Sequence, residues 1–208
     1  MSGKRYLIGW LMVFGLMTFD LAGAAATGPS AVTVHPGEVL RGQFVQVRTM
    51  KGFSKPLTSE GTFTIAPQYG LIWNGTKPFH TATVITAGGL VQSNNGVETL
   101  NLSARKLPFV SQLYGMIGGM LTGDMTQLQK SFTLEQSGTA EHWRIRMLPR
   151  QANDARMPFT EIMAYGGRFV EGVKMVRTGG DADVLTFHNV TLSSSPLSAD
   201  ERTSLGVK

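Results

Sequence analysis

Short runs of apolar residues, some of them alternating with polar residues, recur through the first half of the chain. Such runs lie at residues 62–65, 71–73, 81–86, 90–92 and 97–102. Alternation with a period of two predicts strands that bury one face. Glycine, proline or asparagine follows within two residues of the first four runs, and the Asn74-Gly75 dipeptide is typical of a tight turn between paired strands. The pattern predicts an antiparallel meander from about Gly42 onward.

The spacing changes between Pro108 and Phe132, where apolar residues recur at every third or fourth position. These residues are Phe109, Leu113, Met116, Ile117, Met120, Leu121 and Leu128. They describe one face of a helix, but glycines at 118, 119 and 123 weaken it. We therefore expect two short helices, broken near residues 122–124, with Asp124 capping the second.

Strand patterning returns in the last third of the chain. Trp143, Ile145 and Met147 alternate with more polar positions, and the segments 168–177 and 183–191 flank the turn 178–181. The latter pair predicts a hairpin. The tail at 193–208 is polar, and either a short helix or disorder is compatible with it. No repeat or linker divides the chain, which favours one domain at 27–208.

The amino terminus has the order of parts found in an export signal. Lys4 and Arg5 precede an apolar run at 6–19, and small residues at 22–26 follow. An uncleaved membrane anchor is the alternative, but Asp20 interrupts the run before the roughly 20 residues that span a bilayer. We expect a signal peptide at 1–26, cleavage near Ala26 and a periplasmic protein.

Composition narrows the class of protein. The chain has no cysteine, so disulfides, thiol chemistry and a cysteine-linked lipid anchor are excluded. Charged residues make up only 16% and glycine numbers 25, which favours a turn-rich β protein. The net charge of +5 is spread along the chain and is not clustered with aromatic residues. This spread argues against nucleic-acid binding.

No pattern of catalytic or metal-binding residues stands out. The four histidines at 35, 80, 142 and 188 lack metal-ligand spacing, and no nucleophile elbow or phosphate-binding loop is present. We expect no catalytic residue, no metal, no cofactor and no enzymatic activity. Eight methionines follow the signal segment, three of them at 116–125. These could be ordinary core residues or form an adaptable apolar surface.

Several short segments occur in an order that resembles a known family. They are Gly42-Gln43-Phe44-Val45-Gln46, Gly61-Thr62-Phe63, Pro67, Trp73, Pro78, Leu121-Thr122-Gly123-Asp124, Phe132, Pro149, Gly180-Asp181 and Leu185-Thr186-Phe187. Their order and spacing are similar to those of the outer-membrane lipoprotein carrier proteins, the LolA-like family. The chain departs from that family in two places. Ala66 stands where the classical carriers have a basic residue that hydrogen-bonds to the lid, and the aromatic strand that follows the family's Asp-Gly turn is reduced to Leu90-Val91-Gln92 after Gly88-Gly89.

The resemblance implies a mainly β (α+β) fold, an open antiparallel half-barrel closed by a helical lid. It implies a monomer whose apolar cavity holds acyl chains of lipoproteins or of another lipid. An inner-membrane donor and an outer-membrane acceptor are the implied partners. The residues expected to line the cavity and lid are Phe44, Phe63, Ile65, Leu71, Trp73, Leu113, Met116, Ile117, Met120 and Leu121.

Two other functions stay open at this point. The same fold could serve as a lipid-sensing interaction module of the envelope, without transport. An enzyme would need a cluster of titratable side chains that only the fold could bring together.

Overall fold

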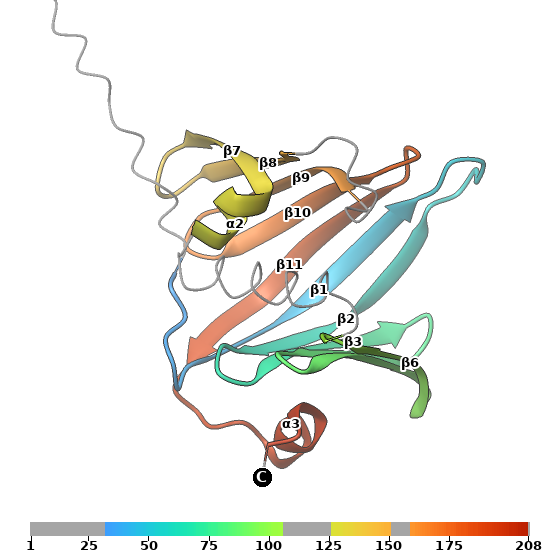
Figure 1. Ribbon diagram of the computed structural model, residues 1–208, viewed down its shortest axis with the longest axis vertical. Helices are drawn as coiled ribbons and strands as arrows, with labels where there is room; N and C mark the ends of the chain where they lie inside the picture. The colour runs from blue at the N-terminus through green and yellow to red at the C-terminus, as the bar shows by residue number, and fades with distance from the viewer. Residues whose placement is uncertain (1–31, 106–125, 151–158, 208) are drawn as a thin grey trace, which may run out of the picture.

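The computed structural model describes residues 32–105, 126–150 and 159–207 (Figure 1). Within these ranges the chain forms one antiparallel sheet of 11 strands and two short helices. The strands are β1 (Val39–Thr49), β2 (Leu57–Ala66), β3 (Gly70–Lys77), β4 (Thr81–Thr86), β5 (Gly89–Asn94), β6 (Val97–Ser103), β7 (Phe132–Gly138), β8 (Trp143–Pro149), β9 (Phe159–Gly166), β10 (Val170–Arg177) and β11 (Ala182–Ser193). The helices are α2 (Thr126–Ser131) and α3 (Ala199–Leu205).

The sheet consists of two meanders joined at its centre. Its strand order is β6-β5-β4-β3-β2-β1-β11-β10-β9-β8-β7, so only the β1–β11 pair connects strands far apart in the sequence. The sheet curves strongly, and its edge strands β6 and β7 do not pair with each other (Figure 1). The prediction of a mainly β, open antiparallel sheet is therefore confirmed.

Apolar side chains of alternate residues cover the inner, concave face in two clusters. The α2 cluster comprises Leu128, Phe132, Trp143, Ile145, Met147, Ile162 and Ala164. The β2–β3 cluster comprises Val34, Leu40, Phe63, Leu71 and Ile85, with Trp73 and Phe187 packed against it. Register explains the second cluster, because Leu40 lies opposite Ile65, and Ile65 opposite Leu71. The inner face is thus apolar on both halves of the sheet.

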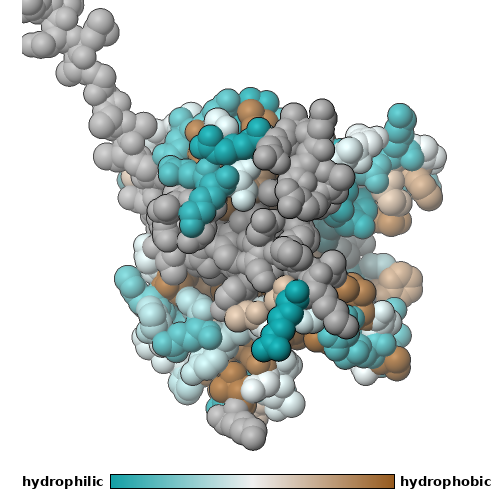
Figure 2. Space-filling view, viewed as in Figure 1, coloured by the Kyte–Doolittle hydropathy of each residue, from teal (hydrophilic) through white to brown (hydrophobic). Residues whose placement is uncertain are grey.

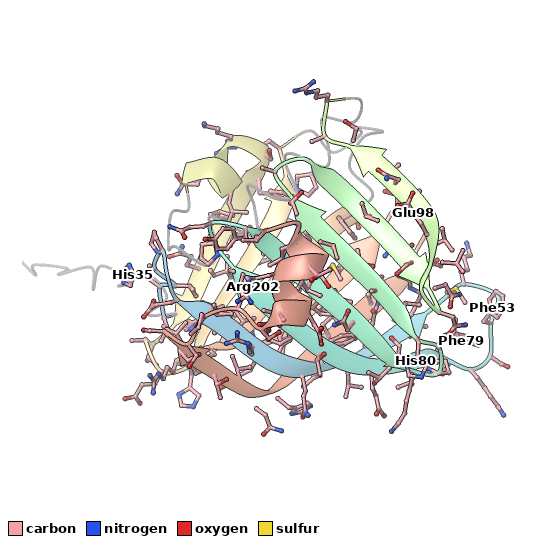
Figure 3. The ribbon with its side chains drawn as sticks, turned by 90° about the horizontal axis from the view of Figure 1, so that it is seen from below. His35, Phe53, Phe79, His80, Glu98 and Arg202 are labelled. Carbon is pink, nitrogen blue, oxygen red and sulfur yellow. The ribbon has the colours of Figure 1, made fainter. Side chains whose placement is uncertain are left out.

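Helix α3 packs on the outer face, as Figures 1 and 3 show. Its Leu205, together with Leu197, is buried against Val39, Ala66 and Ile72 of the sheet. Ser198 begins the helix with a capping box, and Gly206 ends it in the left-handed region at φ 68°. The polar tail therefore contains a short helix, one of the two alternatives, helix or disorder, that its sequence left open.

A partly buried ion pair fixes this helix to the sheet. The Arg41 guanidinium donates from Nε and Nη2 to the Glu201 carboxylate, at 2.8 Å each, and Thr64 Oγ1 donates to it at 2.9 Å. The hydrogen bond from Arg41 is the largest of several contacts that lower the pKa of Glu201 to about 2. The pair therefore stabilises the docked helix at neutral pH, and this contribution is lost as the pH falls from about 4.5 toward 2.

One predicted turn differs from the structure. The Asn74-Gly75 turn is wrong, because β3 continues to Lys77 and Gly75 lies between its partners Gly61 and Thr81. Strand β2 extends past this dipeptide, with Glu60 opposite Lys77, and keeps it in the paired sheet. The chain reverses at residues 78–80 instead. The signal peptide at 1–26 and the first predicted lid helix lie outside the described residues.

Candidate functional site

Four aromatic rings form a continuous layer on the inner face, which we call the aromatic floor. Its members are Phe44 of β1, Phe63 of β2, Trp73 of β3 and Phe187 of β11. The rings of Phe44 and Trp73 stack at a centroid distance of 3.9 Å and an angle of 25°. Phe187 meets Phe63 and Trp73 edge-on, at 5.4 and 6.2 Å. Both geometries are favourable for aromatic pairs.

Glycines in neighbouring strands make room for these rings. Gly61 lies opposite Phe44, and Gly42 lies opposite Phe63. A Cβ atom added to Gly61 would meet the backbone carbonyl of Asn74 and the Phe44 ring, and one added to Gly42 would meet the Phe63 ring. The two aromatic rings therefore lie over bare backbone, in an arrangement that requires glycine at the opposing position.

A cavity of about 290 Å³ opens beside the aromatic floor. It is lined by Phe44, Gln46, Ser59, Trp73, Gly75, Lys77, Pro78, Phe79, Thr81, Thr83 and Gln92. The stacked Phe44 and Trp73 supply its large apolar surface, and the β3–β4 turn supplies Pro78 and Phe79. This volume is near the lower end of the roughly 300–1,000 Å³ typical of ligand sites. The lining is apolar at the floor and polar at the rim.

A buried carboxylate, that of Asp183, lies among polar side chains on the inner face. Asp183 has no exposed surface, and its two oxygens accept hydrogen bonds from Gln46, Arg48 and Arg177, each at 2.7 Å. Burial acts to raise the pKa of Asp183, but the hydrogen bonds from these side chains outweigh it and hold the pKa below its usual value. Asp183 is therefore ionised at neutral pH and joins β11 to β1 and β10.

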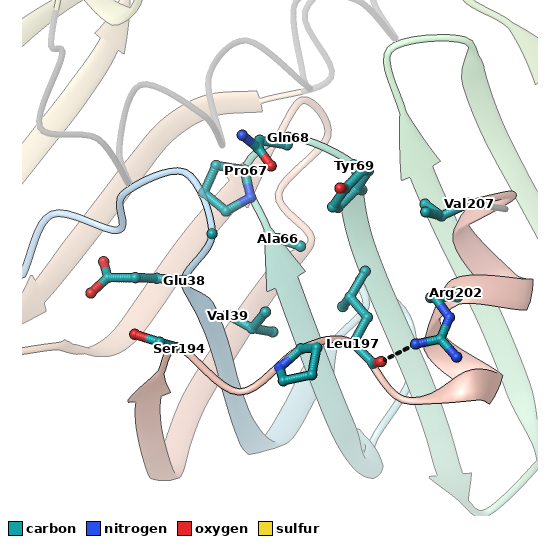
Figure 4. A pocket seen from close by; sticks show the side chains of 12 residues that line it. Glu38, Val39, Ala66, Pro67, Gln68, Tyr69, Ser194, Leu197, Arg202 and Val207 are labelled. Carbon is teal, nitrogen blue, oxygen red and sulfur yellow. Dashed lines mark hydrogen bonds between the residues drawn. The ribbon is translucent and has the colours of Figure 1, made fainter.

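A second cavity, of about 270 Å³, lies on the outer face beside α3 (Figure 4). Its walls combine apolar residues such as Val39 and Leu197 with the polar side chains of Glu38, Gln68 and Arg202. The Arg202 guanidinium donates to the Leu197 carbonyl at 2.9 Å across one side (Figure 4). The sheet separates this cavity from the aromatic floor, so the two are independent.

Large apolar side chains are exposed at one end of the sheet, where the β1–β2, β3–β4 and β5–β6 hairpins turn. They are Phe53, Leu57, Phe79 and Val97, each more than half exposed. Figure 3 places Phe53 and Phe79 at the same end, opposite His35, and Figure 2 shows apolar surface there. Because Phe79 also lines the inner cavity, this end of the sheet contains the cavity mouth.

The five predicted site residues within the described strands all lie on the inner face. Phe44 and Trp73 reach the cavity, whereas Phe63, Ile65 and Leu71 pack in the apolar cluster behind it. The other five predicted site residues, Leu113, Met116, Ile117, Met120 and Leu121, lie outside the described residues. Ala66, at the position where the classical carriers have a basic residue, is buried on the outer face against α3, away from this cavity.

Sequence reasoning missed the polar part of the site. Gln46, Arg48, Asp183 and Arg177 come together from three strands, and no motif marks them. One signal was present, because Asp183 continues the inward-facing positions of Leu185 and Phe187. A carboxylate in such a core-facing position requires hydrogen-bonding or charged partners. This requirement could have suggested a basic partner on a neighbouring strand.

The described residues contain no grouping of three or more His, Asp or Glu side chains that could hold a metal ion. In the same part of the chain, no helix is long and apolar enough to cross a membrane.

Comparison with known proteins decides the family. The family model described as "Outer membrane lipoprotein carrier protein LolA-like" matches residues 32–181, well over half of the chain. The chain belongs to the LolA-like family. This match spans β1 through β10, including the strands of Phe44, Phe63 and Trp73, and ends just before β11, which carries Phe187. No curated protein matches the sequence.

Several solved structures are similar to this chain at low sequence identity. A LolA superfamily protein from Nitrosomonas europaea is 9% identical with a TM-score of 0.42, covering 80% of this chain and 90% of that one. A putative outer membrane lipoprotein-sorting protein domain from Vibrio parahaemolyticus is 8% identical with a TM-score of 0.43, covering 83% and 92%. The matched chain of the Pseudomonas aeruginosa MucA/MucB complex is 13% identical with a TM-score of 0.34, covering 78% of this chain and 54% of that one. The LolA-like assignment rests on the family model and not on these similarities.

Proposed function

We propose that this LolA-like protein is a periplasmic carrier that holds the acyl chains of a lipoprotein or another lipid on the aromatic floor and delivers them toward the outer membrane. The stacked Phe44–Trp73 pair carries this proposal, because it forms an apolar wall of an open cavity. Family membership supports a carrier role. Carrying a lipid in this cavity would require no covalent chemistry.

Simple energetics are consistent with such a role. Each methylene group that leaves water contributes about 0.8 kcal/mol to binding. A chain segment of about five methylenes on the floor would contribute about 4 kcal/mol, which alone corresponds to a Kd of about 1 mM, so tight holding requires contacts along more of the acyl chain. Delivery then requires only an acceptor or membrane with higher affinity for the lipid. The exposed Phe79 at the cavity mouth lies where a lipid would enter or leave.

Export is part of the same proposal. The segment at 1–26 has the charge, apolar run and small residues of a cleavable signal, and residues 27–208 would form the carrier domain. A carrier between two membranes has to leave its donor, so cleavage near Ala26 would free the domain to move. An inner-membrane donor and an outer-membrane acceptor would then be its partners.

Substituting Trp73 tests whether the cavity binds lipid. We expect Trp73→Ala to raise the Kd for a fluorescent fatty acid by about tenfold to a hundredfold, because the variant loses the larger ring of the stacked pair. Displacement of cis-parinaric acid by palmitate measures this change. Thermal unfolding of the same samples reports the fraction folded.

Trp143→Phe is the matched control for this experiment. Trp143 is buried in the α2 cluster on the other half of the inner face, and its indole nitrogen donates to the Gly167 carbonyl at 2.7 Å. Its replacement should reduce stability but leave the Kd of folded protein unchanged. An unchanged Kd in folded Trp73→Ala would contradict the proposed binding surface.

A further inference from the structure

Two arginines on the inner face are held in place by one buried carboxylate. Arg48 Nε donates to Oδ1 of Asp183, and Arg177 Nε donates to Oδ2, both at 2.7 Å. Gln46 Nε2 donates to Oδ1 as well. Asp183 is fully buried, so the cluster has a fixed anchor. Strands β1, β10 and β11 contribute its members, which we call the arginine cluster: Gln46, Arg48, Arg177 and Asp183.

The arginines retain hydrogen-bonding capacity beyond this anchor. Each uses Nε on Asp183, and within the described part of the chain their η nitrogens make no hydrogen bond. Their side chains are 39% and 32% exposed. A guanidinium carries five N–H donors in a planar fork, so most donors of both residues stay available. Two arginines against one aspartate leave a net charge of +1.

The arginine cluster adjoins the acyl-chain site. Gln46 belongs to both, since it lines the cavity two residues after Phe44 and also bonds Asp183. Lys77 also lines the cavity, but its ammonium is paired with Glu60 at 3.1 Å, so the net positive charge comes from the two arginines. On the other side, the Arg177 guanidinium lies 5.4 Å from the Phe159 ring centroid. The cluster therefore lies between the aromatic floor and the second half of the inner face.

From this arrangement we infer that the arginine cluster is the headgroup end of the lipid site and binds an anionic group, a carboxylate or a phosphate. The inference rests on the proposed lipid-carrier function. Pre-oriented guanidinium groups match the planar oxygens of carboxylate and phosphate, and Asp183 removes the need to order them on binding. The ligand would be an anionic amphiphile with its acyl chain on the aromatic floor and its charged oxygens at Arg48 and Arg177.

Three ligands of equal chain length separate the headgroup from the chain. These are palmitate, hexadecyl phosphate and the neutral monopalmitoylglycerol. We expect the full-length mature protein to bind the anionic ligands at least about tenfold more tightly than the neutral one, a difference that decreases with salt. The stronger of the two anions identifies carboxylate or phosphate as the preferred group.

Arg48→Gln and Arg177→Gln should each reduce this preference by about tenfold while leaving the Kd of monopalmitoylglycerol unchanged. Arg144→Gln is the matched control, because Arg144 lies exposed on β8 and its neighbours Trp143 and Ile145 face inward. It removes the same charge from the outer face and should leave the Kd of all three ligands unchanged.

Equal Kd values for the three ligands in the unsubstituted protein would overturn the inference and leave the carrier proposal intact. Binding of none of them would overturn both. The comparison of ligands in the unsubstituted protein requires no variant to fold. Arg48→Lys keeps the charge but loses the planar fork of donors, so it should retain only part of the preference. Full retention of the preference would contradict recognition by the guanidinium geometry.

Discussion

Gly61→Ala is expected to lower the free energy of unfolding by at least about 3 kcal/mol and to abolish lipid binding. The added methyl group would meet the Asn74 carbonyl in the adjacent strand, a backbone atom that cannot rotate away. It would also meet the Phe44 ring, which lies over Gly61 and stacks on Trp73. The substitution therefore separates β2 from β3 and displaces the floor at the same time.

Urea unfolding and palmitate titration measure these two effects. Gly88→Ala is the control, because only the hydroxyl oxygen of Thr86 lies near its added methyl group, at an ordinary contact distance of 3.5 Å. That variant should unfold within about 1 kcal/mol of the parent. If Gly61→Ala were equally stable and bound lipid normally, the close packing of Phe44 over bare backbone would be wrong.

Asp183→Ala is the second substitution with a large expected effect, a loss of about 3 kcal/mol of stability. It removes the buried partner of Arg48 and Arg177 and leaves two like charges close together. We take the lower end of the range for broken buried pairs because both arginines are about a third exposed. Glu171→Ala, which removes an exposed carboxylate from β10, should change stability by less than about 0.5 kcal/mol.

The pH dependence gives this prediction an independent check. The pKa of Asp183 is lower in the folded protein than in the unfolded chain, so its stabilising contribution is present above about pH 4. That contribution is lost as the pH falls through the folded pKa. Urea unfolding at pH 7 and pH 3 should show a smaller difference between parent and Asp183→Ala at the lower pH. A difference that grows on acidification would contradict the assignment of the shift.

The strands with strict alternation were predictable from the sequence, as the hairpin β10–β11 illustrates. Its Gly179 and Gly180 both have positive φ, at 107° and 96°, so the glycine pair correctly indicates a turn. The same reasoning failed at Asn74-Gly75, where Gly75 is paired within the sheet and the chain does not turn. Local composition could not distinguish these cases, because the difference lies in how far the neighbouring strands extend.

The site was predictable only in its apolar part. Phe44 and Trp73 follow from periodicity and family order, and the fold brings their rings into contact. The arginine cluster depends on pairing β1 with β11, which places Arg48 opposite Asp183 across 135 residues of chain. Such long-range register leaves no local trace in the sequence. The one indication in the sequence was that Asp183 alternates in step with the inward-facing Leu185 and Phe187.

The most direct test of the carrier account is native mass spectrometry of the protein purified from the periplasm of its own cells, with lipid extraction and identification. We expect one bound lipid for each chain, lost in folded Trp73→Ala and retained in Trp143→Phe. A parent protein that carries no lipid and acquires none from vesicles would contradict the account. Recovery of a bound membrane regulator in place of lipid would instead favour the sensing module.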